Sequence, residues 1–291
     1  MPIFYTIILK NARRNGTIFA MNGILIVNHF LKGEKFDILH SHLVQSAGSL
    51  GINLIVKTNL EAVFMSERPD FVLFWDKDIM LAKSLERRGI PVFNSSEAIR
   101  KCDNKAETYI ALSGVVKQPK TLIAPMTFFR ADFTEFVDGA VKILGLPLVF
   151  KECYGSFGEQ VFLCRTKEEI ISHISEKPFI LQEFISGANG SDIRIEVVGG
   201  RAVCAMRREN KNDFRANITN GGTAYPYEPT EKQCRIAVDA CRALGLDFGG
   251  VDILCDDILC EVNSNAHIIN IMNSTGVDIA PMIFEDILNK L

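Results

Sequence analysis

The chain has 291 residues, a length that suits one to three domains, with two or three small α/β units the best expectation. Apolar residues make up 47% and charged residues 23%, and this balance excludes a disordered chain or a coiled coil as the dominant state. The net charge of −3 excludes a strong sequence-independent grip on nucleic acid.

The cysteines and the N-terminus indicate the compartment. Eight Cys are spread along the chain without a C-x-x-C pair, so we expect reduced thiols in a cytoplasmic protein and no zinc site. The apolar run at 3–9 is too short to span a bilayer, and no later run reaches the required length of about 18 residues. We therefore expect no membrane partner. Residues 1–20 could lie inside or outside the core fold.

Residues 21–95 alternate short apolar runs with helical spacing. Strands separated by helices predict a parallel sheet covered by helices. No G-x-G-x-x-G follows the first strand and no G-x-x-x-x-G-K-[ST] occurs, so the layout is Rossmann-like without the usual phosphate motif. The expected strands are 24–27, 53–56, 71–74 and 91–93, and the expected helices are 35–50 and 79–88.

Two further α+β units follow, at 96–185 and 186–291. A helix is expected to begin at Glu97 with Ser95 or Ser96 as its cap. In the last unit, Gly199-Gly200 joins two alternating strands, and Asp256-Asp257 joins another pair, so both pairs are predicted hairpins. The other expected helices are 105–113, 134–144, 167–175, 231–244 and 279–288, and the other expected strands are 121–124, 148–151, 160–164, 179–184, 192–198, 202–208, 251–255 and 259–263.

The strongest chemical cluster is Asp252 with Glu261 and Asn263. The two predicted strands pair, and Glu261 and Asn263 face the same side because they are two residues apart. Two carboxylates and an amide oxygen suit Mg²⁺ or Mn²⁺. Solvent-facing strand positions are the alternative, but both carboxylates sit in otherwise apolar strands, where an unpaired charge is costly.

Two lysines form a second candidate cluster. Lys151 ends an apolar strand just before a turn that contains Gly155 and Gly158, and Lys105 lies in the segment DNKAET. A lysine there can hold phosphate oxygens while the glycines let backbone amides approach. A simply solvated lysine is the more common situation, so this pattern alone is weak.

The strand end LQEFI offers a third candidate site. Backbone groups of Gln182, Glu183, Phe184 and Ile185 could meet a purine edge between apolar walls. A core strand leaving its sheet explains the same residues.

Arginine side chains that converge from two paired strands form a fourth candidate site. Asp192 and Arg194 share one strand face, Arg208 ends the partner strand, and Arg215 and Asn217 follow in DFRAN. Guanidinium groups stabilise charge that develops on phosphoryl oxygens. A surface ladder of salt bridges is the alternative.

The order of these motifs resembles the ATP-grasp superfamily, and within it the RimK-like carboxylate–amine ligases (α-L-glutamate ligases). The resemblance covers roughly residues 21–291, and DFRAN…GG together with DIR and VDIL…EVN is quite specific. The matching segments are DNK at 103–105, LVFK-x-x-x-G-x-x-G at 148–158, QEFI at 182–185, SDIRIEVVGG at 191–200, AMRR at 205–208, DFRANITNGG at 213–222, GGVDIL at 249–254 and EVNSN at 261–265.

The resemblance implies three domains: a pre-ATP-grasp domain at 21–95, a central domain at 96–185 and a C-terminal domain at 186–291, with ATP gripped between the last two. It implies the following roles. Lys105, Lys151, Gly155 and Gly158 serve the phosphates, 182–185 the adenine, and Asp192 the ribose, and Arg194 is a further ATP-binding residue. Arg208, Arg215 and Asn217 serve the phosphates and an acyl phosphate, and Asp252, Glu261 and Asn263 hold one or two divalent ions.

The implied reaction activates a carboxylate with ATP as an acyl phosphate, which an amine then attacks. The segments 155–158 and 219–222 are candidate lids that exclude water. The chain departs from the family after EVN, where Asn265-Ala266-His267 replaces a turn containing Pro and Gly, so glutamate as the amine is less secure.

Three functions stay open. The first is addition of glutamate or a related amino acid to a small molecule, peptide or protein tail. The second is a ligase acting on an amino-group carrier protein or a ribosomal peptide, and the third is a non-catalytic nucleotide-binding protein. A homo-oligomer, dimer or tetramer, is expected in each case.

Overall fold

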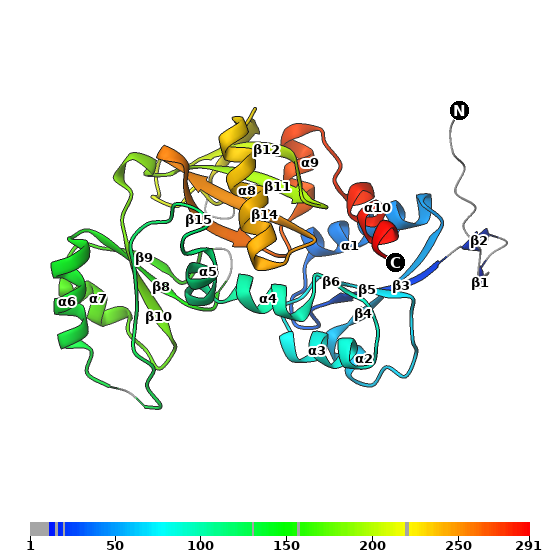
Figure 1. Cartoon of the computed structure of the whole chain (residues 1–291), viewed down its shortest axis with the longest axis horizontal. Helices are drawn as coiled ribbons and strands as arrows, with labels where there is room; N and C mark the ends of the chain where they lie inside the picture. Colours follow the sequence, from blue (N-terminus) through cyan, green and yellow to red (C-terminus); the bar gives the residue numbers. More distant parts are fainter. Residues whose placement is uncertain (1–11, 15–16, 20, 130, 156–157, 219–220) are drawn as a thin grey trace. The chain divides into compact units, whose positions relative to one another are not determined.

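The computed structural model describes the chain except residues 1–11, 15–16, 20, 130, 156–157 and 219–220 (Figure 1). The chain forms two compact units. One contains Met1–Glu97, His267–Ile269 and Asp278–Leu291, and the other contains Ala98–Ala266 and Asn270–Val277. Within residues 12–19, β1 (Ala12–Arg14) and β2 (Thr17–Phe19) pair with each other. The placement of 1–11 lies outside the described residues.

The first unit is built on a parallel sheet with the strand order β4-β3-β5-β6, as the alternating pattern predicts. An additional short helix, α2, follows its N-cap residue Thr58. The Thr58 side chain accepts a hydrogen bond from the Glu61 amide, and the Glu61 carboxylate accepts one from the Thr58 amide. The strands are β3 (Met21–Val27), β4 (Ile52–Thr58), β5 (Phe71–Phe74) and β6 (Val92–Phe93), and the helices are α1 (Glu34–Ser49), α2 (Asn59–Val63) and α3 (Ile79–Arg87).

The helix α10 (Ala280–Lys290) groups with this first unit, although the sequence analysis counts it in the predicted domain 186–291. It packs against α1, and His42 Nε2 lies 2.9 Å from Asp278 Oδ1 beside its first turn. A pattern of helical spacing predicts that α10 forms but not which sheet it covers. The division into three domains stays a prediction.

The helix α4 (Ser96–Asp103) begins at Ser96, one residue before the expected start. The Ser96 amide and hydroxyl both donate to the Glu86 carboxylate, at 2.6 and 2.5 Å. The Ser96 hydroxyl is thus used as a donor to the end of α3, which the capping signal alone did not predict.

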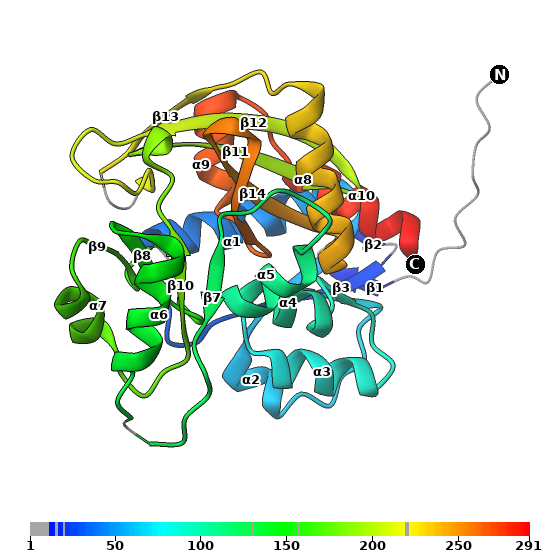
Figure 2. The same cartoon turned by 60° about the vertical axis from the view of Figure 1, so that its left-hand side comes forward.

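The second unit contains two sheets, the first of which is antiparallel with the order β7-β10-β8-β9 (Figure 2). Helices α6 and α7 cover one face, where Val137 and Ile170 pack on Phe150, Phe179 and Leu181. The elements are α5 (Lys105–Leu112), β7 (Thr121–Ile123), α6 (Thr134–Leu144), β8 (Leu148–Glu152), β9 (Val161–Cys164), α7 (Lys167–His173) and β10 (Phe179–Glu183).

The second sheet is antiparallel with the order β13-β12-β11-β14-β15. Both predicted hairpins form, and left-handed φ angles at Gly199 and Gly200 make the first turn tight. The helix α8 packs on one face, over Val197 and Val251. The elements are β11 (Ser191–Val198), β12 (Arg201–Glu209), β13 (Thr223–Pro226), α8 (Glu231–Leu244), β14 (Phe248–Leu254), β15 (Ile258–Asn263) and α9 (Ile268–Thr275), and β13 and α9 were not predicted.

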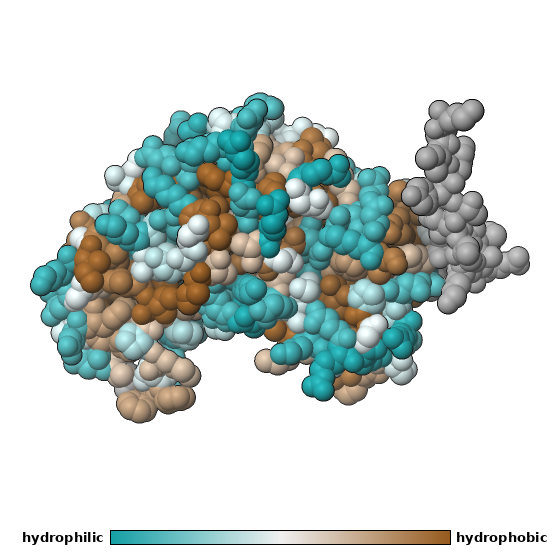
Figure 3. Space-filling view, viewed as in Figure 1, coloured by the Kyte–Doolittle hydropathy of each residue, from teal (hydrophilic) through white to brown (hydrophobic). Residues whose placement is uncertain are grey.

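The surface is of mixed polarity. On the face shown in Figure 3, apolar residues lie in patches separated by hydrophilic ones. Among the described residues, the helices are all too short or too polar to cross a membrane.

The aromatic core beneath α6 and α7 should dominate the stability of its sheet. Phe150 is 1% exposed and its ring stacks on Phe179, with centroids 5.0 Å apart. We expect Phe150→Ala to lower the free energy of unfolding by about 3–5 kcal/mol in urea denaturation, because the cavity cannot collapse fully. The matched variant Phe128→Ala, at a position 87% exposed, should change it by less than about 0.5 kcal/mol. Equal effects would contradict this assignment of the core.

Candidate active site

One cavity of the second unit gathers most of the predicted site residues. It is lined by the ends of β8, β10, β11, β12, β14 and β15 and by the segment after β12. Val149 and Leu254 supply apolar lining. The predicted residues that line it are Lys151, Gly158, Gln182, Glu183, Phe184, Ile185, Asp192, Arg208, Arg215, Asn217, Asp252 and Glu261.

The end of β10 supplies an apolar part of this cavity. Gln182 is buried, and its side-chain amide donates to Thr121 Oγ1 at 2.8 Å, which commits it to the neighbouring strand. Because β10 ends at Glu183, the backbone of Phe184 leaves the sheet at the cavity wall. The Phe184 ring meets Phe214 edge-on at 6.3 Å, so two aromatic side chains flank this end of the cavity.

The two predicted lysines differ in position. Lys151 is 7% exposed and lines the cavity from β8. Lys105 is not part of the lining, but its Nζ lies 3.4 Å from the Gly155 carbonyl oxygen and 4.0 Å from Glu261 Oε1. Lys105 therefore joins the glycine turn to the acidic strand end, beside the cavity.

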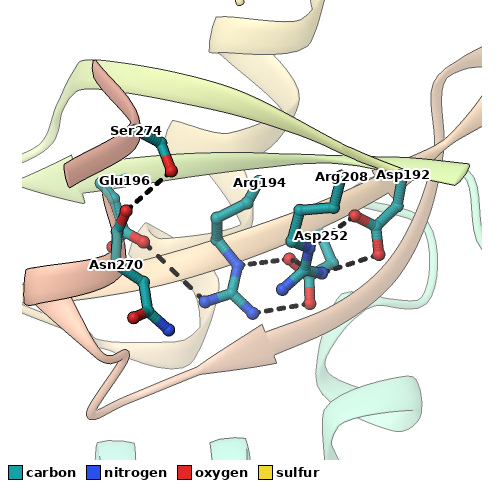
Figure 4. Close-up of polar contacts among 7 residues, drawn as sticks. All are labelled: Asp192, Arg194, Glu196, Arg208, Asp252, Asn270 and Ser274. Atoms are coloured by element: carbon teal, nitrogen blue, oxygen red, sulfur yellow. Dashed lines mark hydrogen bonds and ion pairs between the residues drawn. The ribbon is translucent and has the colours of Figure 1, made fainter. Parts of the chain in front are cut away.

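An ionic network, most of it buried, includes three residues that line the cavity, Asp192, Arg208 and Asp252 (Figure 4). Arg194 makes two hydrogen bonds to Asp252, through Nε to Oδ1 and through Nη2 to Oδ2, the second at 2.8 Å. Arg208 donates to both Asp192 oxygens at 2.7 Å, and its Nη2 also lies 2.9 Å from Asp252 Oδ1. The network continues to Glu196, whose Oε1 is 3.8 Å from Arg194 Nη1.

Charge and burial compete within this network. Burial alone would raise the pKa of Asp252, but Arg194 and Arg208 together hold it below its usual value. The pKa values of Asp192 and Glu196 are raised, chiefly because burial outweighs the arginine charges. Removing one arginine would therefore leave the buried carboxylates with less compensation for their charge.

This geometry changes the expectation for two polar residues. Arg194 is absent from the cavity lining and faces Asp252 and Glu196, so its placement does not support a nucleotide contact. Asp192 does line the cavity, while both its oxygens accept from Arg208. Sequence reasoning missed Glu196, although its position two residues after Arg194 on the same strand face signals it.

The predicted metal ligands meet at the β14–β15 hairpin. Asp252 lies opposite Glu261 in the register, and the Glu261 side chain is 36% exposed. Asn263 does not line the cavity, but its buried Nδ2 has no hydrogen-bond partner among the described residues. Nowhere in the described part of the chain do three His, Cys, Asp or Glu side chains converge as a metal site. The two carboxylates and one amide still fit Mg²⁺, which keeps several water and phosphate ligands.

The segment after β12 carries Arg215 and Asn217 to the cavity. Two hydrogen bonds with the Asp213 carboxylate orient Arg215, at 3.0 and 2.7 Å, and these bonds lower the pKa of Asp213. Arg215 Nη1 also donates to the Gly158 carbonyl at 2.5 Å, which ties this segment to the glycine turn. The centres of both predicted lids, at 156–157 and 219–220, lie outside the described residues.

A cysteine that the sequence did not single out also lines the cavity. Burial raises the pKa of Cys260 to about 11, and nearby carboxylates add to the effect of burial, while Lys151 opposes it. The thiol therefore stays protonated at neutral pH and acts as a small apolar wall residue.

Comparison with known proteins shows which family and which solved structures this chain is similar to. Residues 102–287 match the RimK-like ATP-grasp domain. An uncharacterized protein of Mycoplasma pneumoniae is 34% identical over 78% of this chain and 85% of its own length. A probable alpha-L-glutamate ligase of Maridesulfovibrio salexigens is 34% identical over 70% of this chain and 69% of its own. The human N-acetylaspartylglutamate synthase A is 30% identical over 84% of this chain and 64% of its own length.

Solved structures share the fold at low identity. The D-cycloserine synthetase structure has a TM-score of 0.76 and 14% identity, and it covers 92% of this chain and 99% of its own. A D-alanine–D-alanine ligase from Bacillus anthracis has a TM-score of 0.72 and 17% identity, with coverage of 93% and 98%. These likenesses support the ATP-grasp fold.

The Arg194–Asp252 pair gives a test of the network. We expect Arg194→Met to lower the free energy of unfolding by about 3 kcal/mol at pH 7, because Asp252 then keeps only Arg208 and Glu196 loses the cation beside it inside the protein. The matched variant Arg201→Met, at the exposed start of β12, should change it by less than about 0.5 kcal/mol.

The pH dependence has a definite sign. In the wild type, the lowered pKa of Asp252 contributes stability that is present above the unfolded pKa and is lost as the pH falls through the folded value. In Arg194→Met only Arg208 still opposes burial, so the pKa of Asp252 lies above its wild-type value. Urea unfolding should therefore show a penalty that shrinks as the pH falls toward about 4. A penalty independent of pH would contradict the role of Asp252.

Proposed function

The chain belongs to the RimK-like ATP-grasp family and is an ATP-dependent ligase, and we propose that it joins a carboxylate to an amine through an acyl phosphate. The observation that carries the proposal is the single cavity that holds Lys151, Arg208, Arg215 and Glu261 beside an apolar strand end. Cations and a carboxylate suit a magnesium–phosphate group, and the apolar end suits a purine.

In this proposal the chain acts by positioning and by charge neutralisation. Lys151 and Lys105 hold phosphate oxygens, and the backbone at 183–185 meets the adenine edge. Asp192 holds the ribose. Arg208, Arg215 and Asn217 face the transferred phosphoryl group, where guanidinium groups stabilise charge as it develops.

Glu261, Asn263 and the remaining lone pairs of Asp252 would hold the divalent ion. Mg²⁺ neutralises charge on the β- and γ-phosphates when it is bound. We propose that the site holds two divalent ions and that Mn²⁺ can take the place of Mg²⁺. Arg194 does not touch the nucleotide in this account and fixes the orientation of the Asp252 carboxylate.

For the amine we propose glutamate or a related amino acid, because relatives are named alpha-L-glutamate ligase and N-acetylaspartylglutamate synthase. The alternatives are a carrier-protein or peptide substrate, and nucleotide binding without turnover. A homo-oligomer also stays a proposal. The departure at 265–267 bears on the amine: His267 groups with the first compact unit, where its Nε2 lies 3.3 Å from the Lys35 carbonyl oxygen.

The Glu261 carboxylate gives the first functional test. With Mg·ATP, candidate carboxylates and a panel of amino acids, Glu261→Gln should lower ADP release by about 100-fold or more, because the ion loses a charged ligand. Glu228→Gln, at an exposed position, should release ADP like the wild type. Amino-acid-stimulated release that survives Glu261→Gln would sink the metal assignment. Tight ATP binding without release in any mixture would favour the sensor alternative or a macromolecular substrate.

Lys151 separates binding from stability. Lys151→Met keeps the side-chain length and removes a buried charge, so we expect unchanged or higher stability together with about tenfold or greater loss of ATP affinity. Isothermal titration and urea unfolding measure the two quantities. Lys142→Met, an exposed lysine on α6, should leave both unchanged. Unaltered ATP affinity in Lys151→Met would show that this lysine is structural.

A further inference from the structure

A second and larger cavity of the second unit lies along β9. Its volume is about 790 Å³. One wall is the strand β9 with His173 of α7, whose ring stacks on Phe162 at 3.9 Å. The other wall is the segment 209–215 with the turn at 189–191. The nucleotide site uses few of these residues, so the proposed function leaves most of this cavity unassigned.

The strand β9 is the open edge of its sheet. It pairs with β8, and no described strand pairs with it on the other side (Figure 2). The Glu152 amide donates to the Gln160 carbonyl, and antiparallel pairing alternates from there, so the backbone groups of Val161 and Leu163 point away from β8. Arg215 Nη1, 3.5 Å from the Val161 carbonyl oxygen, approaches from that outer side.

The charges along this cavity are unbalanced. Its two lining carboxylates are already paired, Glu209 with Arg207 at 2.8 Å and Asp213 with Arg215 at 2.7 Å. Arg165 and Lys211 are exposed in the lining and form no ion pair in the described part of the chain. The cavity therefore combines outward backbone groups of β9, of which the Val161 carbonyl oxygen accepts a long hydrogen bond from Arg215, with two cations that form no ion pair among the described residues.

The β9 cavity adjoins the nucleotide cavity. The two share Val161, Ser191, Phe214 and Arg215 as lining residues. Arg215 thus faces both, and a molecule seated along β9 would lie next to the place where the proposed phosphoryl transfer occurs.

We propose that β9 binds an extended acidic peptide segment, which adds a strand to the open edge of this sheet. Main-chain hydrogen bonds to Val161 and Leu163 supply affinity, and Arg165 and Lys211 select acidic side chains. The inference rests on the proposed ligase function and narrows it, because the substrate is then part of a peptide or protein rather than a free small molecule.

The test measures fluorescence anisotropy of a fluorescein-labelled peptide that alternates Glu and Val, beside a counterpart with Lys in place of Glu. Leu163→Pro removes an outward N–H, which an edge strand tolerates, and Leu163→Val is its matched control with the N–H retained. Arg165→Glu combined with Lys211→Glu reverses both cations, and Arg201→Glu, at the exposed start of β12, is the control.

We expect the wild type to bind the acidic peptide and not the lysine peptide. Binding should weaken about tenfold or more in Leu163→Pro and in the double charge reversal, and stay at the wild-type level in both controls. The inference is overturned if the wild type binds neither peptide or both alike, or if neither altered variant weakens binding. A thermal melt verifies that each variant is folded.

ADP release with ATP and small amino acids, measured on the same proteins, separates this inference from the proposed function. Release that persists without any peptide binding would overturn the peptide site alone. Peptide binding that depends on Leu163 and the two cations, with no release under any condition including the peptide as substrate, would overturn the ligase proposal alone.

Discussion

The contact on which the site depends is the one between Asp252 and two arginines. Asp252 is 2% exposed on a central strand of its sheet, where an isolated carboxylate would be very unfavourable. Two arginines keep it charged, Arg194 on β11, which pairs with β14, and Arg208 on β12, which pairs with β11. Arg208 extends the same contacts to Asp192. The lining residues Asp192, Arg208 and Asp252 are therefore oriented by ion pairs with one another and with Arg194.

Antiparallel pairing explains why these residues meet. Arg194 lies opposite Asp252 in the β11–β14 register, Arg208 lies opposite Asp192 in the β11–β12 register, and Glu261 lies opposite Asp252 across the last hairpin. Each pair is a direct cross-strand neighbour, so a shift of one residue would turn the whole set to the other face. The tight turn at Gly199-Gly200 helps to hold that register.

The open edge of the other sheet, β9, differs from these strands because it has a neighbour on one side only among the described strands. Every second residue of β9 points its backbone groups away from β8, and polar and cationic side chains lie beside that edge. An unpaired edge is usually blunted or covered, and here it borders a cavity that shares four residues with the nucleotide cavity. The proposed nucleotide site is thus built on a buried ionic network, and the proposed peptide site beside it is built on an open strand edge.

Local pattern was sufficient for much of this protein. The strand–helix alternation of 21–95, both glycine- and aspartate-containing hairpins and the carboxylates of VDIL and EVN follow from spacing, because period and turn chemistry are local properties. Spacing could not show that Arg194 turns beneath Asp252 instead of toward the cavity, that α10 returns to α1, or that β9 ends its sheet at an open cavity. Those outcomes depend on which distant segments share a core or a charge, and only the folded chain, by weighing burial against pairing, decides them.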